Sequence, residues 1–301
     1  MTNREQGPWS EFAATEPGPP PPERVRGAEL RVTFVNHSTF LVQTAGLNFL
    51  TDPVWSERVS PVTFTGPRRR RAPGLRMEEL PPIDAILISH NHYDHFDTAT
   101  LARLLERDRP AVFCPLGLAR PLGKIGFTEI CELDWWQSVA WRGLNMHCMP
   151  AQHFSARTPF DRRRTLWCGW MLDNEGGSIY FAGDTGFGSL FEEIGASFPR
   201  IRLSLLPIGA FKPHWFMGPI HMAPSQALYA HRILKSQLSI ATHFGTFPLA
   251  DDGEAEPIRE LQRALQLESP TQPFAVLQEG EGMDIPQLQR FSEESAATTT
   301  L

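Results

Sequence analysis

Short apolar runs separated by turn residues dominate the chain and predict β-strands. The runs fall at residues 30–35, 39–43, 48–51, 83–88, 111–114, 138–141, 144–150, 166–172, 178–182, 203–206, 238–242 and 274–277. Segments with helical spacing predict helices at residues 98–106, 118–124, 190–196, 225–234 and 255–265. Strand runs and helices recur in two successive halves, an order typical of two stacked sheets covered by helices. The expected fold class is therefore α+β.

Both ends of the chain lack this pattern. Residues 1–28 are polar and rich in proline, so we expect a flexible arm there. Residues 286–301 end in serine, alanine and threonine, and we expect a flexible tail. No linker-like break lies between these segments, which predicts one domain over residues 29–285.

The composition is that of a folded protein with a sizeable core, with 41% hydrophobic residues, 8 Trp and 20 Phe. A net charge of −6 argues against nucleic acid as a partner. Cys114, Cys131, Cys148 and Cys168 lack paired spacing, which indicates buried, reduced thiols. No apolar run reaches the roughly 20 residues that span a bilayer, and nothing resembles a signal peptide. We therefore expect a cytoplasmic protein. This expectation leaves open whether the protein attaches to a membrane surface.

A cluster of metal-binding residue types follows the isoleucine-rich strand predicted before Ser89. The motif Ser-His-Asn-His-Tyr-Asp-His begins at Ser89 and places His90, His92, Asp94 and His95 within six residues. Strand ends commonly carry the chemistry of α/β proteins, and imidazole with carboxylate suits zinc and similar metals. A polar loop that caps the next helix is the alternative, which four potential ligand residues within six positions disfavour. The alternation predicts His90 and His92 at one metal, and Asp94 and His95 at a second.

Three more strand ends carry the same kind of residue. His153 follows the strand at 144–150, Asp184 follows the strand at 178–182, and His243 follows the strand at 238–242. A single buried histidine would be explained by packing, since such rings often bond a neighbouring carbonyl. Four strand ends with one arrangement instead favour side chains that converge on a metal centre.

Three further polar residues are candidates for a supporting role. Asp52, Asp97 and Thr185 could orient metal ligands by hydrogen bonding to them. They could equally be turn or helix-cap residues, and the sequence leaves both interpretations open.

With these residues in place, the chain resembles the metallo-β-lactamase superfamily, whose signature is His-x-His-x-Asp-His followed by a His, an Asp and a His. Within the superfamily it is similar to the N-acyl-phosphatidylethanolamine-hydrolysing phospholipase D group. The matching segments are 50–56 (Leu-Thr-Asp-Pro-Val-Trp-Ser), 80–95, 132–136, 181–186 (Phe-Ala-Gly-Asp-Thr-Gly), 207–211, 215–217 and 243–247. They run in order through nearly the whole predicted domain, and both termini lie outside them.

The resemblance implies an αββα sandwich that binds two zinc ions. His90, His92 and His153 would hold one ion, Asp94, His95 and His243 the other, and Asp184 would bridge both. It also implies that Tyr93 and His221 lie at the substrate, although His221 could instead only cap the helix that follows it. Ligands of this kind without cysteine also accept manganese or iron, so zinc rests partly on the resemblance.

Two metals held in this way could present a hydroxide to a phosphorus atom. The resemblance accordingly implies a dinuclear zinc hydrolase, a phosphodiesterase of phospholipase D type that acts on N-acyl-phosphatidylethanolamine-like lipids. Asp94 and Asp184 are the expected catalytic residues, Asp184 because it could orient the hydroxide while touching both ions. The expected partner is a phospholipid or another small phosphodiester. A sugar-phosphate lactonase is the alternative enzyme, and a non-catalytic, metal-stabilised binding protein is the alternative of another class.

Arginine runs and apolar loop segments raise the question of peripheral membrane contact. The arginines at 68–71 and at 162–164, the second run close to Phe160, could attract an anionic lipid surface or could be solvated charge only. The apolar segments 62–65 and 215–217 are candidates for membrane contact or for core. Contact with a membrane is therefore a hypothesis.

Overall fold

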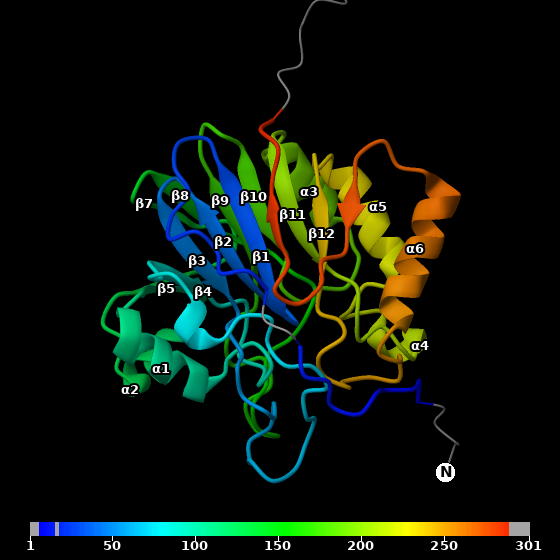
Figure 1. Cartoon of the computed structure of the whole chain (residues 1–301), viewed down its shortest axis with the longest axis horizontal. Helices are drawn as coiled ribbons and strands as arrows, with labels where there is room; N and C mark the ends of the chain where they lie inside the picture. The colour runs from blue at the N-terminus through cyan, green and yellow to red at the C-terminus, as the bar shows by residue number, and fades with distance from the viewer. Residues whose placement is uncertain (1–5, 16–17, 289–301) are drawn as a thin grey trace, which may run out of the picture.

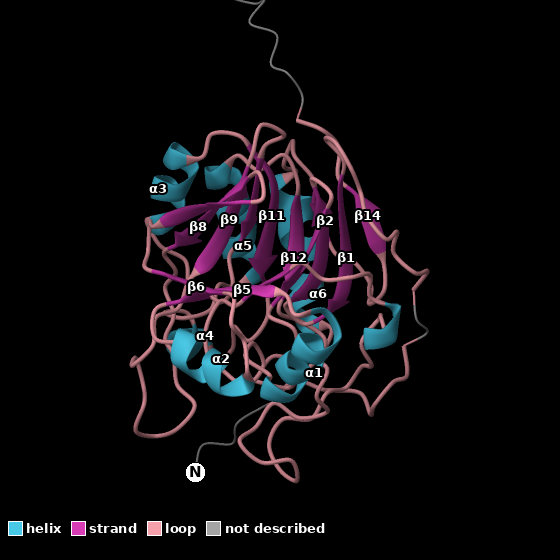
Figure 2. Ribbon diagram, turned by 90° about the vertical axis from the view of Figure 1, so that its left-hand side faces the viewer, coloured by secondary structure: helices cyan, strands magenta, loops and turns pink. Residues whose placement is uncertain are grey.

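The computed structural model describes residues 6–15 and 18–288. Within these residues the chain forms two seven-stranded mixed sheets that pack face to face, with helices on the outer sides (Figures 1 and 2). This arrangement confirms the expected α+β class and the αββα sandwich.

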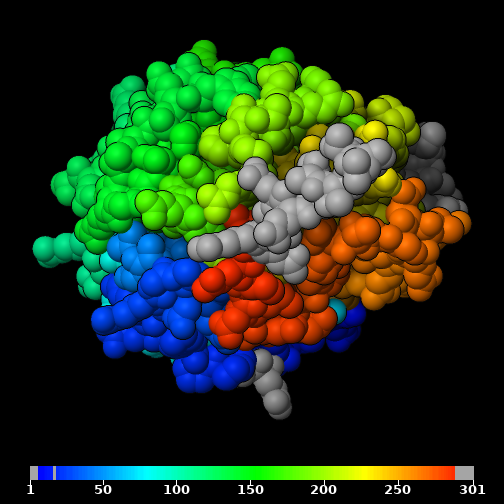
Figure 3. Space-filling model, turned by 90° about the horizontal axis from the view of Figure 1, so that it is seen from above, coloured from blue at the N-terminus to red at the C-terminus, as the bar shows by residue number. Residues whose placement is uncertain are grey.

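The first sheet has the strand order β14-β1-β2-β3-β4-β5-β6. Its strands are β1 (Leu30–Asn36), β2 (Thr39–Thr44), β3 (Leu47–Thr51), β4 (Ala85–Leu87), β5 (Ala111–Pro115), β6 (Ile130–Leu133) and β14 (Gly282–Asp284). From β14 to β3 neighbouring strands are antiparallel, and from β3 to β6 they are parallel. The pairing of β14 with β1 brings the two ends of the domain together, so the red and blue regions lie side by side in Figure 3.

The second sheet has the order β13-β12-β11-β10-β9-β8-β7. Its strands are β7 (Ser138–Trp141), β8 (Leu144–Met149), β9 (Gly169–Asp173), β10 (Ser178–Phe181), β11 (Ile201–Pro207), β12 (Ser239–Thr242) and β13 (Phe274–Ala275). From β7 to β10 neighbours are antiparallel, and from β10 to β13 they are parallel. Parallel strands have their carboxyl ends at the same edge of a sheet, so the segments that follow β10, β11 and β12 all begin at that edge.

Helices cover both sheets. On the first sheet lie α1 (Thr98–Asp108) and α2 (Ala119–Ile125), and on the second lie α3 (Leu190–Ser197), α5 (Pro224–Leu234) and α6 (Glu256–Glu268). Two short helices, η1 (Met77–Glu79) and α4 (His214–Met217), lie in connecting segments. No helix of the described ranges is long and apolar enough to cross a bilayer.

Successive residues of β4 and β5 divide between the two sides of the first sheet. Leu87 and Phe113 pack into the core between the sheets. Ile86 and Val112 pack on the other side, in a cluster with Leu101 of α1. Because both faces are buried, these strands read as continuous apolar runs rather than as alternating ones.

The structure departs from the expected elements where strands are short. Neither β6 nor β14 was expected, because neither is a buried apolar run: three of the four residues of β6 are only half-buried, and β14 has no buried residue. The expected strand at 166–172 begins only at Gly169. Leu166 N donates to Leu116 O and Cys168 N to Ser89 O, so this stretch pairs with loops instead of with a strand.

The arm that we expected to be flexible follows a defined path where it is described. Gly7 N donates to Asp251 O at 2.8 Å, and Gly18 N donates to Gly74 O at 3.1 Å. Further along, Pro22 O accepts a hydrogen bond of 2.8 Å from the Gln43 side chain. Proline-rich backbone keeps its carbonyl acceptors, which here bind the domain surface. Most of the expected tail, residues 289–301, lies outside the described residues, and the boundaries at 29 and 285 stay predictions.

Candidate metal centre

The seven predicted ligands come together at the edge of the sandwich where β4, β8, β10 and β12 end. His90, His92, Asp94 and His95 follow β4, His153 follows β8, Asp184 follows β10, and His243 follows β12. Six of these side chains are buried, and His92 is half-buried. All residues of β4, β10 and β12 and most residues of β8 are buried, so the scaffold behind the cluster is rigid.

Gly183 allows Asp184 to approach the histidine motif. It has a φ of +60°, a left-handed conformation that glycine adopts without a steric penalty. A Cβ atom at this position would lie 2.7 Å from Ser89 Cβ and 2.8 Å from Cys168 O. The turn after β10 therefore packs against the turn after β4 at a distance that only glycine permits.

Three imidazole nitrogens form the first group of donors. His92 Nδ1 lies 2.8 Å from His90 Nε2 and 3.2 Å from His153 Nε2. The rings of His90 and His153 each meet the ring of His92 at 80°, so the nitrogens converge without stacking of the rings. Nitrogens bound about 2 Å from one tetrahedral zinc ion lie roughly 3.3 Å apart, which is close to these separations.

The second group combines two imidazoles with a carboxylate. Asp94 Oδ2 lies 3.2 Å from His95 Nε2 and 3.4 Å from His243 Nε2. Asp184 stands between the two groups. Its Oδ2 lies 3.1 Å from His243 Nε2, 3.2 Å from His95 Nε2, 3.8 Å from His153 Nε2 and 4.0 Å from His90 Nε2.

Buried partners orient several of these rings from behind. His95 Nδ1 lies 2.7 Å from Asp52 Oδ2, and His153 Nδ1 lies 2.9 Å from Ile220 O. Such contacts set which ring nitrogen carries the proton and which is available to a metal. Of the three residues considered in the sequence, Asp52 orients a candidate ligand directly.

The other two residues have different roles. Asp97 caps α1, accepting hydrogen bonds from Ala99 N and Thr100 N. The Thr185 hydroxyl accepts a hydrogen bond from Gln152 N at 2.9 Å. For Asp97 the helix-cap interpretation is therefore the one that the structure shows.

His37 is a further residue of the candidate site, and the sequence analysis missed it. It is buried in the turn between β1 and β2, and its Nε2 lies 3.0 Å from Asp94 Oδ2. Its ring centroid is 4.2 Å from that of His243. The signal was present, because His37 follows an apolar strand in the same way as the four sites that were recognised.

The two residues expected at the substrate lie beside the cluster. His221 is buried, with ring centroids 5.0 Å from His153 and 5.2 Å from His243. It does not cap α5, whose N-cap residue is Ala223. Tyr93 is half-buried and borders a cleft of about 480 Å³ that Arg157 and residues 60–63 also line.

Electrostatic interactions within the cluster shift its protonation equilibria. Burial lowers the pKa of His90 and His153 well below the usual range, which keeps these rings neutral. Burial alone would also lower the pKa of His95 and His243. The attraction of both rings to Asp184 outweighs this effect of burial. As a result, the pKa of His95 lies well above its usual value, and that of His243 is raised to about 9. Burial would raise the pKa of Asp184, but His243 and His95 hold it well below the usual range.

This donor set fits two divalent cations. Asp94 and Asp184 are buried carboxylates whose charged neighbours among the described residues are histidines. His95 Nε2, His243 Nε2 and Asp184 Oδ1 are buried without a hydrogen-bond partner within the described residues. Buried charges need compensation and buried polar atoms need partners, and cations at the centre would supply both. Nitrogen and carboxylate donors suit zinc, manganese or iron.

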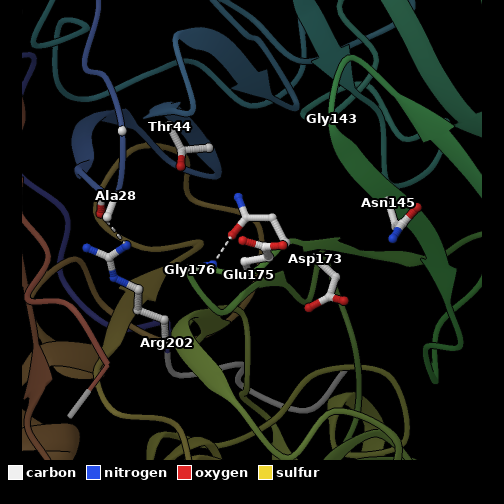
Figure 4. A pocket seen from close by; sticks show the side chains of 10 residues that line it. Ala28, Thr44, Gly143, Asn145, Asp173, Glu175, Gly176 and Arg202 are labelled. Carbon is white, nitrogen blue, oxygen red and sulfur yellow. Dashed lines mark hydrogen bonds between the residues drawn. The ribbon is translucent and has the colours of Figure 1, made fainter. Parts of the chain in front are cut away.

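A larger cleft of about 690 Å³ lies away from the cluster, at the turns between β7 and β8 and between β9 and β10. Figure 4 shows Arg202 beside it, with its guanidinium directed at Ala28 O, to which it donates at 2.8 Å. Asp173, Asn145 and Glu175 also line this cleft. None of the candidate metal ligands lines it, so size alone does not identify the functional site here.

Comparison with curated proteins finds related phospholipases. The chain is 37% identical over 232 residues to N-acyl-phosphatidylethanolamine-hydrolyzing phospholipase D 1 of Caenorhabditis elegans, a match that covers 73% of this chain and 65% of the relative. It is 34% identical over 224 residues to the mitochondrial N-acyl-phosphatidylethanolamine-hydrolyzing phospholipase D of Saccharomyces cerevisiae, with 72% and 48% covered. The chain thus spans less than two thirds of the length of either relative.

The fold and the family profile agree with these matches. A solved metallo hydrolase from the archaeon Ignicoccus hospitalis superposes with a TM-score of 0.64 and 23% identity, over 86% of this chain and 99% of that one. The profile of the family described as "Beta-lactamase superfamily domain" matches residues 47–244, which include all seven candidate ligands. The chain therefore belongs to the β-lactamase superfamily and has the metallo-β-lactamase fold.

Proposed function

We propose that this protein is a dinuclear metal-dependent hydrolase that cleaves phosphodiesters, with N-acyl-phosphatidylethanolamine-like lipids as the substrate class. The observation that carries the proposal is the position of the Asp184 carboxylate between two groups of three donors. His90, His92 and His153 would hold one cation, and Asp94, His95 and His243 the other. The identity to phospholipases of this type supports the substrate class.

Bound zinc ions would supply Lewis acidity and a water nucleophile that is available near neutral pH. The chain's own residues would position the reactants. Asp184 can accept a hydrogen bond from an attacking water in addition to holding the cations, because a carboxylate has about four acceptor positions and its Oδ1 has no hydrogen-bond partner within the described residues. Asp94 is held by His37, which keeps its carboxylate directed at the centre.

His221 is suited to contact the substrate phosphate. Burial lowers its pKa to about 3, so the ring is neutral and can donate one N–H. Its Nδ1 is buried and lacks a hydrogen-bond partner within the described residues. The Tyr93 hydroxyl already donates to Arg157 O at 2.9 Å, so we assign Tyr93 to the wall of the cleft.

Loops around the centre present exposed aromatic side chains, which favours a lipid substrate. Phe64 is 80% exposed, Phe160 is 85% exposed and Trp215 is 81% exposed. The segments that carry them adjoin Tyr93, His153 and His221 in the structure. Large exposed apolar groups around one site are typical of surfaces that meet a membrane or a ligand.

The arginine run at 68–71 contributes less to this surface than its sequence implied. Arg69 is buried and donates to Ser56 O and Val54 O. Arg71 pairs with Glu254 and Glu279. The arginines at 162–164 are exposed, and we propose them as the basic part of a peripheral membrane contact.

A hydrolysis assay in ¹⁸O-water tests the proposed reaction. Zinc-loaded protein would be supplied with an N-acyl-phosphatidylethanolamine, a simple phosphodiester, a sugar-phosphate lactone and a thioester, with the metal content measured. Phospholipase D-type cleavage releases phosphatidic acid that carries the ¹⁸O label. Asp184→Asn should lose more than 100-fold in rate, since it removes the charge that both donor groups share. Faster turnover of the lactone or thioester than of either phosphodiester would refute the substrate class, and no turnover at all would favour a binding protein.

Vesicle sedimentation tests the membrane contact separately. The combined variant Phe64→Ser, Phe160→Ser and Trp215→Ser should bind anionic vesicles less tightly and keep its activity on a soluble phosphodiester. Leu267→Ser is a matched control, because Leu267 is 77% exposed on α6, away from these loops. Equal vesicle binding by both variants would rule out the aromatic contact.

A further inference from the structure

His243 differs from the other candidate ligands in how its ring is supported. The second ring nitrogens of His95 and His153 bond Asp52 and Ile220 O. His243 Nε2 faces Asp184, and its Nδ1 is buried with no hydrogen-bond partner within the described part of the chain. Metal-binding histidines almost always bond a carboxylate, a carbonyl or a water through this second nitrogen. His243 therefore needs a partner that a protein atom does not provide.

His243 lines a small cavity. It has a volume of about 10 Å³, and His243, His37 and Asp252 are among the residues that line it. The Nδ1 atom of His37 is likewise buried and without a partner among the described residues. A cavity holds one water when it offers roughly 10–15 Å³ and two to four polar partners. The volume reaches the lower bound for one water, and His243, His37 and Asp252 supply three polar residues to the lining.

Asp252 is a suitable anchor for such a water. Its carboxylate is buried and already accepts hydrogen bonds from Ala210 N at 3.1 Å and from Lys212 N at 3.3 Å. Each oxygen is engaged by one backbone donor, and a carboxylate has about four acceptor positions, so acceptor capacity remains. The two backbone contacts hold the carboxylate in place.

The N-terminal arm closes the cavity. Trp9 lines it and donates from Nε1 to Asp252 O at 3.0 Å. Before Trp9, Gly7 N donates to Asp251 O at 2.8 Å and Pro8 O accepts from Glu254 N at 3.0 Å. After it, Ser10 N donates to Glu254 Oε2 at 3.0 Å. Residues 7–10 and 251–254 thus run against each other over the back of His243.

We propose that one ordered water links His243 Nδ1 to the Asp252 carboxylate, and that Trp9 seals this link from solvent. Asp252 is then a positioning residue for the second donor group, and the arm contributes to metal retention at that group. The proposal rests on the dinuclear centre of the proposed function. It predicts that metal loss upon mutation is selective for the ion held by Asp94, His95 and His243.

Chelator titration of zinc-loaded full-length protein tests Asp252, with zinc counted by elemental analysis. Asp252→Asn should release one of two zinc ions at about 10–100-fold lower chelator strength, the usual effect of losing such a supporting contact. The ion held by His90, His92 and His153 should be retained as in the parent protein. Cobalt-substituted protein should show a changed absorption spectrum for one of its two ions. Asp97→Asn is the matched control, since it removes a buried carboxylate that caps α1 and touches no candidate ligand.

Trp9→Ala tests the seal, with Phe12→Ala as the control on the same arm. Phe12 is 50% exposed and does not line the cavity. Trp9→Ala should weaken retention of the same single ion, whereas Phe12→Ala should not. A high-resolution crystal structure should show one water within hydrogen-bond distance of His243 Nδ1 and Asp252.

The outcomes separate this proposal from the function on which it rests. If the parent protein binds no metal, the dinuclear centre itself is wrong. If the parent binds two ions and Asp252→Asn retains both equally well, the water link is wrong and the centre stands. Equal loss of both ions from Asp252→Asn would also overturn the water link. So would a loss of metal that a lower melting temperature of the metal-free variant explains.

Discussion

Nε2 of His37 lies 3.0 Å from Oδ2 of Asp94, so a residue of the first hairpin holds a candidate metal ligand of the histidine motif. The contact joins positions 57 residues apart and is buried. An aspartate held on one side presents its carboxylate in one orientation, which reduces the entropy lost on metal binding. His37 thereby extends the centre beyond the residues of the family signature.

His37→Ala should weaken binding of the ion at Asp94, His95 and His243 by about 10–100-fold. His37→Gln, which keeps a donor of similar reach, should recover much of this loss. Isothermal titration of metal-free protein with zinc measures both variants. If alanine and glutamine behave alike, the effect comes from packing and the hydrogen bond to Asp94 is unimportant.

Asp52→Asn should act on the same ion through His95. The Asp52 carboxylate accepts from Ser89 N at 2.7 Å and lies 2.7 Å from His95 Nδ1. An amide that turns its NH₂ toward Nδ1 would favour the tautomer with a proton on Nε2, the nitrogen that faces the metal position. We expect a 10–100-fold loss of affinity for one ion by chelator competition. Unchanged affinity would show that Asp52 supports the fold and does not orient the ring.

Gly183→Ala should destabilise the protein by about 1–3 kcal/mol and displace Asp184, because a Cβ there overlaps Ser89. Gly46→Ala is the control, since Gly46 also has a positive φ of 78° but nothing within 4 Å of its Cβ position. Thermal unfolding and zinc content should be measured for both. Full zinc content and a melting temperature equal to that of Gly46→Ala would disprove the close approach.

Metal-free protein should lose stability as the pH rises from 6.5 toward 9. Although burial lowers it, attraction to Asp184 raises the pKa of His243 from 6.5 to about 9 in the folded chain. A histidine whose pKa is higher in the folded than in the unfolded state contributes to the stability of the folded state. For His243 this contribution is fully present below pH 6.5 and is lost as the pH rises through about 9. Histidines with a lowered pKa, such as His90 and His153, titrate below this window.

Calorimetry at several pH values checks this dependence. The melting temperature of metal-free protein should fall across the window. That of zinc-loaded protein should stay nearly level, because bound metal displaces the proton from His243. Zinc affinity should correspondingly increase with pH over the same range. A level profile for the metal-free protein would contradict the assignment.

The sequence by itself determined most of the strands and the seven candidate ligands. A buried strand appears in the sequence as an apolar run. A polar residue that directly follows such a run lies at the end of that strand, and this placement does not depend on contacts with distant segments. The motif at His90 and the three later strand ends were therefore visible without coordinates. His37 obeys the same rule and could have been found with it.

Only the tertiary structure decided what these residues meet. That Asp184 lies between two donor groups, that Asp52 supports His95, and that Trp9 covers the back of His243 all depend on contacts between distant segments. The arginine run looked like a charged surface, yet Arg69 is buried, because carbonyls of another loop accept its hydrogen bonds. The local pattern of apolar and polar residues indicates whether a residue faces the core or the solvent. Which partner it finds is set by the packing of the two sheets, as in the 2.9 Å bond between His37 N and the Thr246 hydroxyl, 209 residues apart.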